Sequence, residues 1–300
     1  MRVCVSGGDI VGLVVAHMCR VRGHSVVLIE HSMTLGQTAF LPTFKYLERT
    51  QEVLTLLDGL GIVYGEYTIA TGLLERGSVA ECPRKVSDAV HHANWRKTRL
   101  TAMPAGAVGL ADPEVCSKRY AVSFDWRDFA KRLSAGLTVA HEMGVHARTA
   151  DVVFETLPPW ESRLVKQGSS RDAMAVALNM LPVRANKDRY LRWDVVYTPH
   201  TPGSAIHRLY HGEETGYVCE FSGVIAEDAV TSDLNYLFPE GWHVDGPIST
   251  TSGKLVDLQE SPAWESKVRP IGRMAQWDEE ISLTRVIREV AGRIRHADAR

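Results

Sequence analysis

The first thirty residues carry the most regular hydrophobic pattern in the chain. Residues 3–6 form a short β-branched apolar run, and residues 10–21 are apolar at most positions, which is typical of a helix buried on several sides. Gly23 can end this helix in a left-handed conformation. Residues 25–29 are almost continuously apolar, as in a parallel strand covered on both faces. The pattern predicts a strand–turn–helix–strand unit that closes on Glu30.

A glycine-rich turn joins the first predicted strand to the helix and contains Gly7, Gly8 and Gly12. In a dinucleotide-binding βαβ unit, such glycines let a pyrophosphate approach the amino terminus of the helix. An acidic residue about 20 positions later binds the ribose hydroxyls. Glu30 has this position, so the residues predict a dinucleotide-binding unit.

Asp9 occupies the position where the fingerprint has its second glycine. In one interpretation Asp9 caps the helix, the turn shifts slightly and dinucleotide binding is retained. In the other, its bulk and negative charge weaken or abolish binding of an anionic ligand at the helix terminus. We adopt the first interpretation as the expectation.

The rest of the chain mixes helical and strand-like patterns. Helices are predicted over residues 47–60 and 129–143, a hairpin over residues 73–79 around Arg76-Gly77, and strands at residues 193–197, 207–210 and 217–221. A last helix has apolar residues at helical spacing from Leu283 to Ile294, with three acidic residues at 278–280 in its first turn.

Composition excludes several classes of protein. The chain has 300 residues, 45% hydrophobic and 23% charged, with a formal net charge of −2. A disordered chain, a disulfide-rich miniprotein and a protein that coats nucleic acid through bulk charge are therefore excluded. Five cysteines without a C-x-x-C pair indicate free thiols in a reducing compartment. Without an apolar run of roughly 20 residues or a secretory leader, we expect a cytoplasmic protein that does not enter membranes.

Several blocks resemble the glutathione-reductase-type flavoproteins, in particular the branch with amine oxidases, protoporphyrinogen oxidases and UDP-galactopyranose mutases. After Glu30, Gly36-Gln37 stands where that branch has a glycine pair, so the second glycine is replaced. Residues 149–160 resemble its "D-x-V-I-x-T-x-P" strand, and residues 270–277 resemble its "GR-x-x-x-W/Y" segment.

This resemblance implies FAD as cofactor and an α/β fold with two parts. A Rossmann-like FAD-binding domain would comprise residues 1–40, 145–180 and 262–300, and a discontinuous α+β substrate domain residues 41–144 and 181–261. The implied cofactor-binding residues are Gly7, Gly8, Asp9, Gly12, Glu30, Gly36, Gln37, Thr156, Pro158, Gly272, Arg273 and Met274.

Strands of the substrate domain cover the flavin in this family, which makes Tyr197, His207, Arg208 and Tyr210 the catalytic candidates. His207 can equally be a structural histidine. The resemblance implies an enzyme acting on an amine, by oxidation or by flavin-assisted bond cleavage. The chain also resembles small bacteriophage flavoproteins that act on aminated thymine in DNA. The alternatives are a sugar-nucleotide mutase and a degenerate relative without catalytic activity.

A basic stretch over residues 84–119 offers a candidate phosphate or DNA site, with Arg96, Lys97 and Arg99 as binding residues. The alternative for this stretch is an ordinary solvated surface. A zinc site from Cys82, His91, His92 and Cys116 is rejected because the spacing fits no structural zinc motif, so no metal is expected. A G-x-S-x-G hydrolase turn is absent from the sequence.

Overall fold

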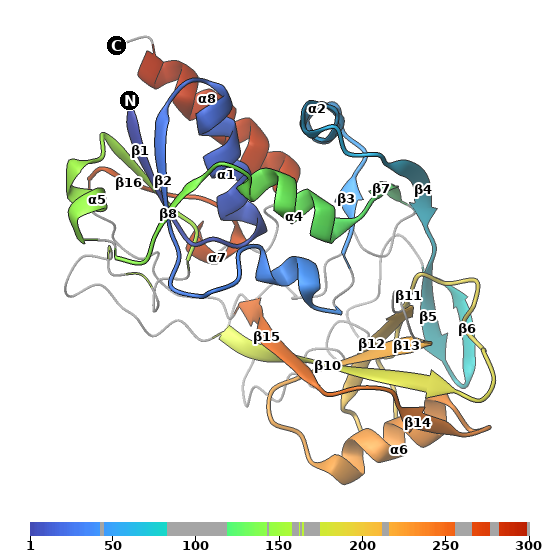
Figure 1. The fold of residues 1–300 in the computed structure, drawn as a ribbon. Helices are drawn as coiled ribbons and strands as arrows, with labels where there is room; N and C mark the ends of the chain where they lie inside the picture. Colours follow the sequence, from blue (N-terminus) through green and yellow to red (C-terminus); the bar gives the residue numbers. More distant parts are fainter. Residues whose placement is uncertain are drawn as a thin grey trace.

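The computed structural model describes residues 1–42, 45–82, 119–142, 144–157, 162, 164, 175–211, 216–255, 266–276 and 282–298. A five-stranded sheet with its helices and an eight-stranded sheet form two parts of the molecule, one above the other in Figure 1. Within the described residues, no helix is both long and apolar enough to cross a membrane.

The five-stranded sheet has the order β16-β9-β1-β2-β8, and all its strands are parallel. Its strands are β1 (Arg2–Ser6), β2 (Ser25–Ile29), β8 (Thr138–Ala140), β9 (Val152–Glu155) and β16 (Val268–Pro270). This is the arrangement of a Rossmann-type sheet, so the predicted α/β class is confirmed.

Helices cover both faces of this sheet because side chains alternate along its strands. Val3 and Val5 of β1 pack into the cluster formed with α1 (Ile10–Val21), whereas Cys4 points to the opposite face. Helices α4 (Trp126–Ser134) and α8 (Leu283–Asp298) pack against α1, and α2 (Gln51–Leu60) packs against both of them. Helix α5 (Gly144–Thr149) covers the second face.

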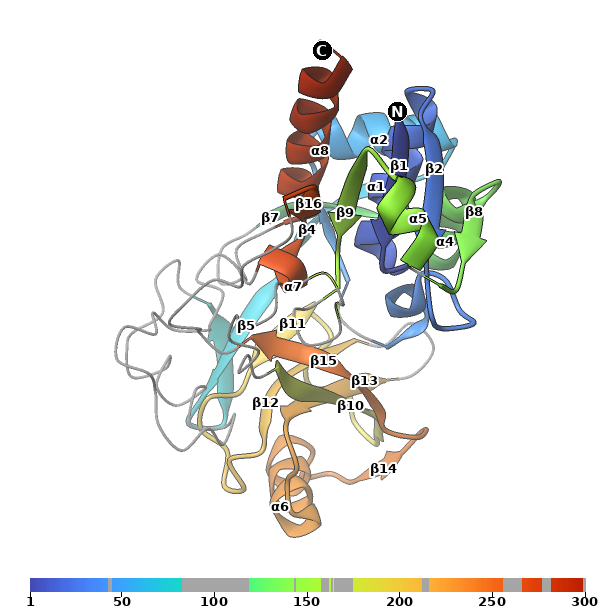
Figure 2. The same ribbon diagram turned by 90° about the vertical axis from the view of Figure 1, so that its left-hand side faces the viewer.

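The eight-stranded sheet is mixed and has the order β14-β10-β13-β12-β11-β5-β6, with β15 also pairing with β10. Its strands are β5 (Thr71–Glu75), β6 (Ser78–Glu81), β10 (Ala175–Ala185), β11 (Val195–Tyr197), β12 (Ile206–His211), β13 (Tyr217–Ser222), β14 (Trp242–Val244) and β15 (Ser249–Leu255). Helix α6 (Glu227–Leu237) covers the face that is turned away from the five-stranded sheet in both views (Figure 1 and Figure 2).

Shorter elements connect the two parts. Strands β3 (Leu47–Glu48), β4 (Gly65–Ile69) and β7 (Arg119–Ser123) form an antiparallel three-stranded sheet. The 3-10 helix η1 (Gln37–Phe40) follows β2, and α7 (Arg273–Gln276) follows β16. In both views α7 lies between the two large sheets (Figure 1 and Figure 2).

The first predicted unit is confirmed, and Gly23 adopts φ 81° where α1 was expected to end. The hairpin is also confirmed, since Arg76 (φ 50°) and Gly77 (φ 81°) form the turn between β5 and β6. Two positive φ values in a two-residue loop match the right-handed twist of the flanking strands.

Three predicted helices have different ends. The helix expected from residue 47 begins at Gln51, because residues 47–48 pair with β7. The helix expected over residues 129–143 begins earlier, at Trp126, because Asp125 accepts hydrogen bonds from the first-turn amides. It ends at Ser134, and residues 138–140 join the parallel sheet instead.

The last helix, α8, begins at Leu283, so its first turn contains no acidic residue. The predicted acidic first turn is therefore wrong. The division into domains stays a prediction. Strand β8 lies within the predicted substrate segment but belongs to the five-stranded sheet, and β10 crosses the predicted boundary at residue 180 and belongs to the eight-stranded sheet.

Candidate functional site

The strand order of the five-stranded sheet reverses between β1 and β9. From β1 the chain continues to β2 and β8 on one side, whereas β9 and β16 lie on the other. In open parallel sheets, ligands bind in the crevice beyond the carboxyl ends of the strands at such a switch point. The candidate site therefore lies where residues 6 and 155 end two neighbouring strands.

The glycine turn after β1 leaves no room for side chains. Gly7 has φ 96°, and a Cβ there would overlap Thr156 Oγ1. A Cβ on Gly12 would overlap the carbonyl oxygen of Gly7, so helix and strand approach at van der Waals distance. A Cβ on Gly8 would lie 2.8 Å from Glu30 Oε2. These are the close approaches that a dinucleotide-binding turn requires.

Asp9 precedes α1 but does not cap it, since its side chain makes no hydrogen bond to the helix. Its Oδ1 accepts from the Thr38 backbone N–H at 3.0 Å, and its Oδ2 accepts from the Thr38 hydroxyl. The expectation that Asp9 caps α1 is therefore wrong: its carboxylate binds η1 instead. Consequently it does not occupy the first-turn N–H groups of α1, which are the groups that face an anion.

Glu30 directly follows β2 and connects this strand to the same turn. Its Oε2 accepts from Gly8 N–H at 2.5 Å, and its Oε1 accepts from Ser32 N–H at 2.7 Å. Gly36, in the left-handed region with φ 64°, donates its N–H to the carbonyl of Gly8 at 2.8 Å. The turn, Glu30 and the start of η1 at Gln37 thus form one hydrogen-bonded unit.

A second glycine turn reaches the same edge from β16. Gly272 has φ 83°, and a Cβ there would lie 2.8 Å from Val11 Cγ1 in the first turn of α1. Ile271 donates its N–H to the carbonyl of Glu155 at 2.9 Å. Arg273 and Met274 begin α7, directly after this turn. The turn after the first strand and the turn at Gly272 therefore meet at the switch point.

Thr156 completes this edge, because its hydroxyl donates to the carbonyl of Ser6 at 2.7 Å. Pro158, Arg96, Lys97 and Arg99 lie outside the described residues, as does most of the basic stretch. Their predicted roles stay predictions.

On the eight-stranded sheet, a β-bulge directs two neighbouring side chains to one carboxylate. The register between β12 and β13 shifts between Ile206 and Arg208, so His207 is the additional residue. His207 Nε2 lies 2.6 Å from Glu220 Oε1, and Arg208 Nη2 donates to Glu220 Oε2 at 2.6 Å. The side chain of Glu220 is buried, and that of Arg208 is 24% exposed.

The charges of the neighbouring side chains determine where the protons lie in this cluster of His207, Arg208 and Glu220. Burial by itself would raise the pKa of Glu220, but Arg208 and His207 together lower it to about 2. A carboxylate only accepts hydrogen bonds, so Nε2 of His207 carries the proton. Burial works against the charge of Arg208, yet Glu220 raises its pKa above the usual range.

The predicted catalytic residues share one face of the sheet. In the strand register, Tyr197 pairs with Arg208, and Tyr210 pairs with Val218. These side chains lie on the face of the sheet opposite to the hydrophobic cluster that α6 covers. Tyr210 and His207 are buried, and their predicted catalytic roles stay predictions. Tyr197 is half-buried and, with Arg208, extends toward the surface.

Two acidic residues of the site, Glu155 and Glu220, were not singled out from the sequence. Each interrupts an otherwise apolar strand, Val-Val-Phe-Glu in β9 and Tyr-Val-Cys-Glu-Phe in β13, and each is fully or almost fully buried. A charged residue at a core position is the signal that could have found both.

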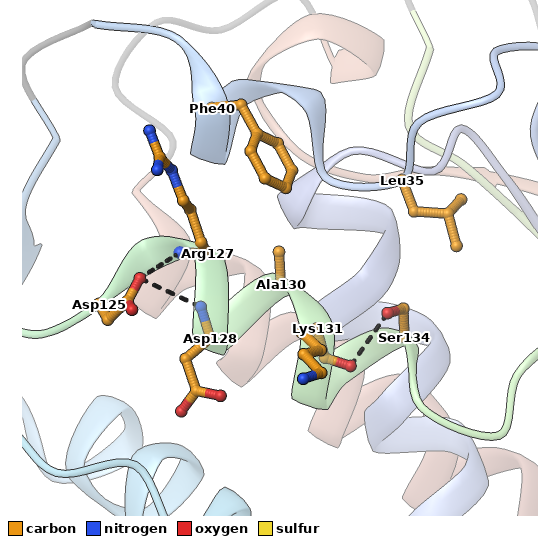
Figure 3. Close-up of a pocket in the computed structure, with 8 residues that line it drawn as sticks. All are labelled: Leu35, Phe40, Asp125, Arg127, Asp128, Ala130, Lys131 and Ser134. Carbon is orange, nitrogen blue, oxygen red and sulfur yellow. Dashed lines mark hydrogen bonds between the residues drawn. The ribbon is translucent and has the colours of Figure 1, made fainter.

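A hollow of about 510 Å³ lies between α4 and the segment around η1 (Figure 3). Helix α4 and the segment around η1 form it, and its lining residues are Leu35, Phe40, Asp125, Arg127, Asp128, Ala130, Lys131 and Ser134. Asp125 points back to its own helix, where it accepts from the N–H groups of Arg127 and Asp128. None of the predicted site residues lines this hollow, so the carboxyl ends of the strands at the switch point remain the candidate site.

Comparison with solved structures defines the fold class. An oxidoreductase from Methanosarcina mazei aligns with 98% of this chain and 100% of its own, at 13% identity and a TM-score of 0.60. A reduced UDP-galactopyranose mutase aligns over 99% of this chain and 95% of its own, at 12% identity and a TM-score of 0.65. A putrescine oxidase bound to putrescine aligns over 97% of this chain and 98% of its own, at 12% identity and a TM-score of 0.53.

At these identities the likeness establishes the fold. The chain shares its overall fold with these proteins: a Rossmann-type parallel sheet and a separate mixed sheet. No protein-family model matches the sequence, and no curated protein matches it significantly.

Proposed function

We propose that this protein is an FAD-dependent enzyme that acts on an amine, by oxidation or by flavin-assisted bond cleavage. The observation that carries the proposal is the meeting of two glycine turns, at Gly7 and Gly272, at the switch point of the parallel sheet. The eight-stranded sheet lies opposite, with polar side chains on the face turned away from α6. Structural similarity to an oxidoreductase and to a putrescine oxidase supports this reading.

The residues at the switch point fit FAD. The turn from Gly7 to Gly12 and the uncapped start of α1 would hold the pyrophosphate, and the Glu30 carboxylate would bind the ribose. The Gly272 turn would approach the cofactor from the other side. When bound, FAD supplies the electron acceptor.

The protein's own side chains would position the substrate. Arg208 and Tyr197 are the members of the sheet face that extend toward the surface, so they are the groups that would contact the amine substrate. Glu220 fixes the Arg208 guanidinium through the 2.6 Å hydrogen bond. His207 and Tyr210, being buried, would act as positioning residues.

A second candidate is a mutase that acts on a sugar nucleotide. It is favoured by the similarity to UDP-galactopyranose mutase and by the Gly272-Arg273 block, whose cation could neutralise a diphosphate. Action on an aminated thymine base in phage DNA stays a prediction from the sequence, because its basic stretch lies outside the described residues.

The deciding experiment is the absorbance spectrum of the purified protein, followed by identification of any flavin released on denaturation. A flavin spectrum and released FAD support the proposal, and a colourless protein that does not take up added FAD points to the degenerate relative. Anaerobic bleaching of the flavin by putrescine supports amine oxidation. Turnover of UDP-galactopyranose only with reduced flavin would instead select the mutase.

The Asp9→Asn substitution is expected to tighten FAD binding about fivefold at low salt, because it removes a negative charge beside the diphosphate. Asparagine retains an acceptor for the Thr38 N–H, so η1 keeps its contact with the turn. The measurement is the dissociation constant of FAD from quenching of flavin fluorescence. Asp125→Asn, at the start of α4, is the control and should leave the dissociation constant of FAD unchanged. Equal or weaker binding by Asp9→Asn would place this carboxylate away from the diphosphate.

A further inference from the structure

Glu155 places a buried carboxyl group at the switch point. It is the last residue of β9, where it pairs with Ser6 of β1 on one side and Pro270 of β16 on the other. Its side chain is 0% exposed. Since Gly7 and Gly272 lie just beyond these two partners, the carboxyl lies at the sheet edge from which both glycine turns start.

Two neutral donors contact this carboxyl. Leu157 N–H donates to Oε1 at 2.9 Å, and the Ser162 hydroxyl donates to Oε2 at 2.5 Å. In the part of the chain that the structure describes, no cationic side chain forms an ion pair with Glu155. A buried carboxylate without a cationic partner is unfavourable, so this environment favours the neutral acid.

The titratable neighbours on the sheet do not supply a compensating charge. Burial, and then Glu155 itself, raise the pKa of Cys4 on β1 to about 11, so this thiol stays neutral. Lys267, which precedes β16, directs its ammonium group to carbonyl oxygens at the end of α5. The guanidinium of Arg269 binds the carbonyls of Ser266 and Val268.

Two further carboxylates lie at this edge, and Arg273, which begins α7 after the Gly272 turn, is a cationic residue of the same edge. Asp9, at the start of α1, and Glu30, at the end of β2, both hold carboxylates that accept backbone hydrogen bonds. A diphosphate would add further negative charge to the same crevice. Of the three carboxyl groups, Glu155 is the fully buried one, and it is therefore the one that a proton can neutralise at least cost.

We propose that Glu155 couples FAD binding to the uptake of one proton from solvent, so that the diphosphate binds beside a neutral carboxylic acid. This inference rests on the proposed function. Burial, partly offset by the donors Ser162 and Leu157, raises the pKa of Glu155 to about 7, so the free protein is partly protonated near neutrality. Bound diphosphate favours the protonated form further, and by reciprocity the proton strengthens FAD binding.

The test is a titration of apoprotein with FAD, followed by flavin fluorescence, from about pH 6 to about pH 8.5. The wild-type dissociation constant is expected to rise roughly tenfold over this range, and that of Glu155→Gln to change less than about twofold. Asp151→Asn, at the exposed amino-terminal side of the same strand, is the matched control and should follow wild type. Calorimetry in two buffers of different ionisation enthalpy should show proton uptake by wild type and none by Glu155→Gln.

A measurement without FAD tests the same carboxyl independently. Because the pKa in the folded protein lies above the ordinary value of 4.5, the stabilising effect of the proton is complete below that value. It is lost as the pH rises toward about 7. The urea midpoint of the apoprotein should therefore fall over this window in wild type and less in Glu155→Gln.

Ser162→Ala provides a second variant if Glu155→Gln folds poorly. It removes a donor that favours the ionised carboxylate, so the pH at which FAD binding weakens should shift upward. FAD binding with the same pH dependence in wild type, Glu155→Gln and Ser162→Ala overturns this inference and leaves the proposed function intact. Failure of every form to bind FAD at any pH overturns both.

Discussion

Replacement of Gly12 by alanine is expected to abolish FAD binding and to lower the free energy of unfolding by about 3 kcal/mol. The new Cβ would overlap the carbonyl oxygen of Gly7, and a backbone atom cannot move aside as a flexible side chain can. Helix α1 would have to move away from β1, although Leu13 and Val14 of that helix are completely buried against the sheet. Urea unfolding and flavin fluorescence measure the two effects.

Gly292→Ala is the matched control, because Gly292 also lies within a helix, α8, but a Cβ there would meet no atom within 4 Å. This substitution is expected to leave FAD binding unchanged and to stabilise the helix by up to about 1 kcal/mol. Normal FAD binding and stability in Gly12→Ala would show that the first turn does not lie as close to the strand as described.

Glu220→Gln is expected to lower the free energy of unfolding by about 3 kcal/mol at neutral pH, because it leaves Arg208 without its anionic partner inside the sheet. The pH dependence has a definite sign. The pKa of Glu220 is lowered to about 2, so its stabilising effect is complete above the ordinary value of 4.5. This stabilising effect is lost as the pH falls toward 2. The difference in the free energy of unfolding between wild type and Glu220→Gln should therefore narrow as the pH falls from 4.5 toward 2.

The control for this variant is an ion pair of similar length on the surface. Glu66 lies 2.6 Å from Arg49, with both side chains about half exposed, and solvent screens such pairs. Glu66→Gln should change the urea midpoint little at any pH. An equally small effect of Glu220→Gln would mean that the buried cluster contributes no more than a surface pair.

Local patterns predicted the parts of the fold that local forces determine. The glycine turn, α1, Gly23 and the hairpin at Arg76-Gly77 depend on the conformational preferences of a few adjacent residues. The order of these elements was enough to predict the Rossmann class, because a βαβ unit with a glycine turn has few alternative arrangements.

Elements that depend on distant partners were harder to predict. Residues 138–140 have no strong pattern of their own and become β8 by pairing with β2, more than 100 residues earlier in the chain. The meeting of His207 and Arg208 at Glu220 depends on a bulge, and a register shift cannot be read from a single strand. The binding of Asp9 to Thr38 likewise depends on where η1 packs.

The strand order also determines when, during synthesis, the proposed FAD site could form. The Gly272 turn of the candidate site follows β16, residues 268–270, whereas the first turn follows β1. During synthesis the opening βαβ unit therefore emerges long before the strand and the helix α8 that complete its sheet and core. The proposed FAD site would therefore be complete only after β16 and the Gly272 turn have been synthesised, and until α8 emerges the apolar face of α1 lacks the helix that packs against it.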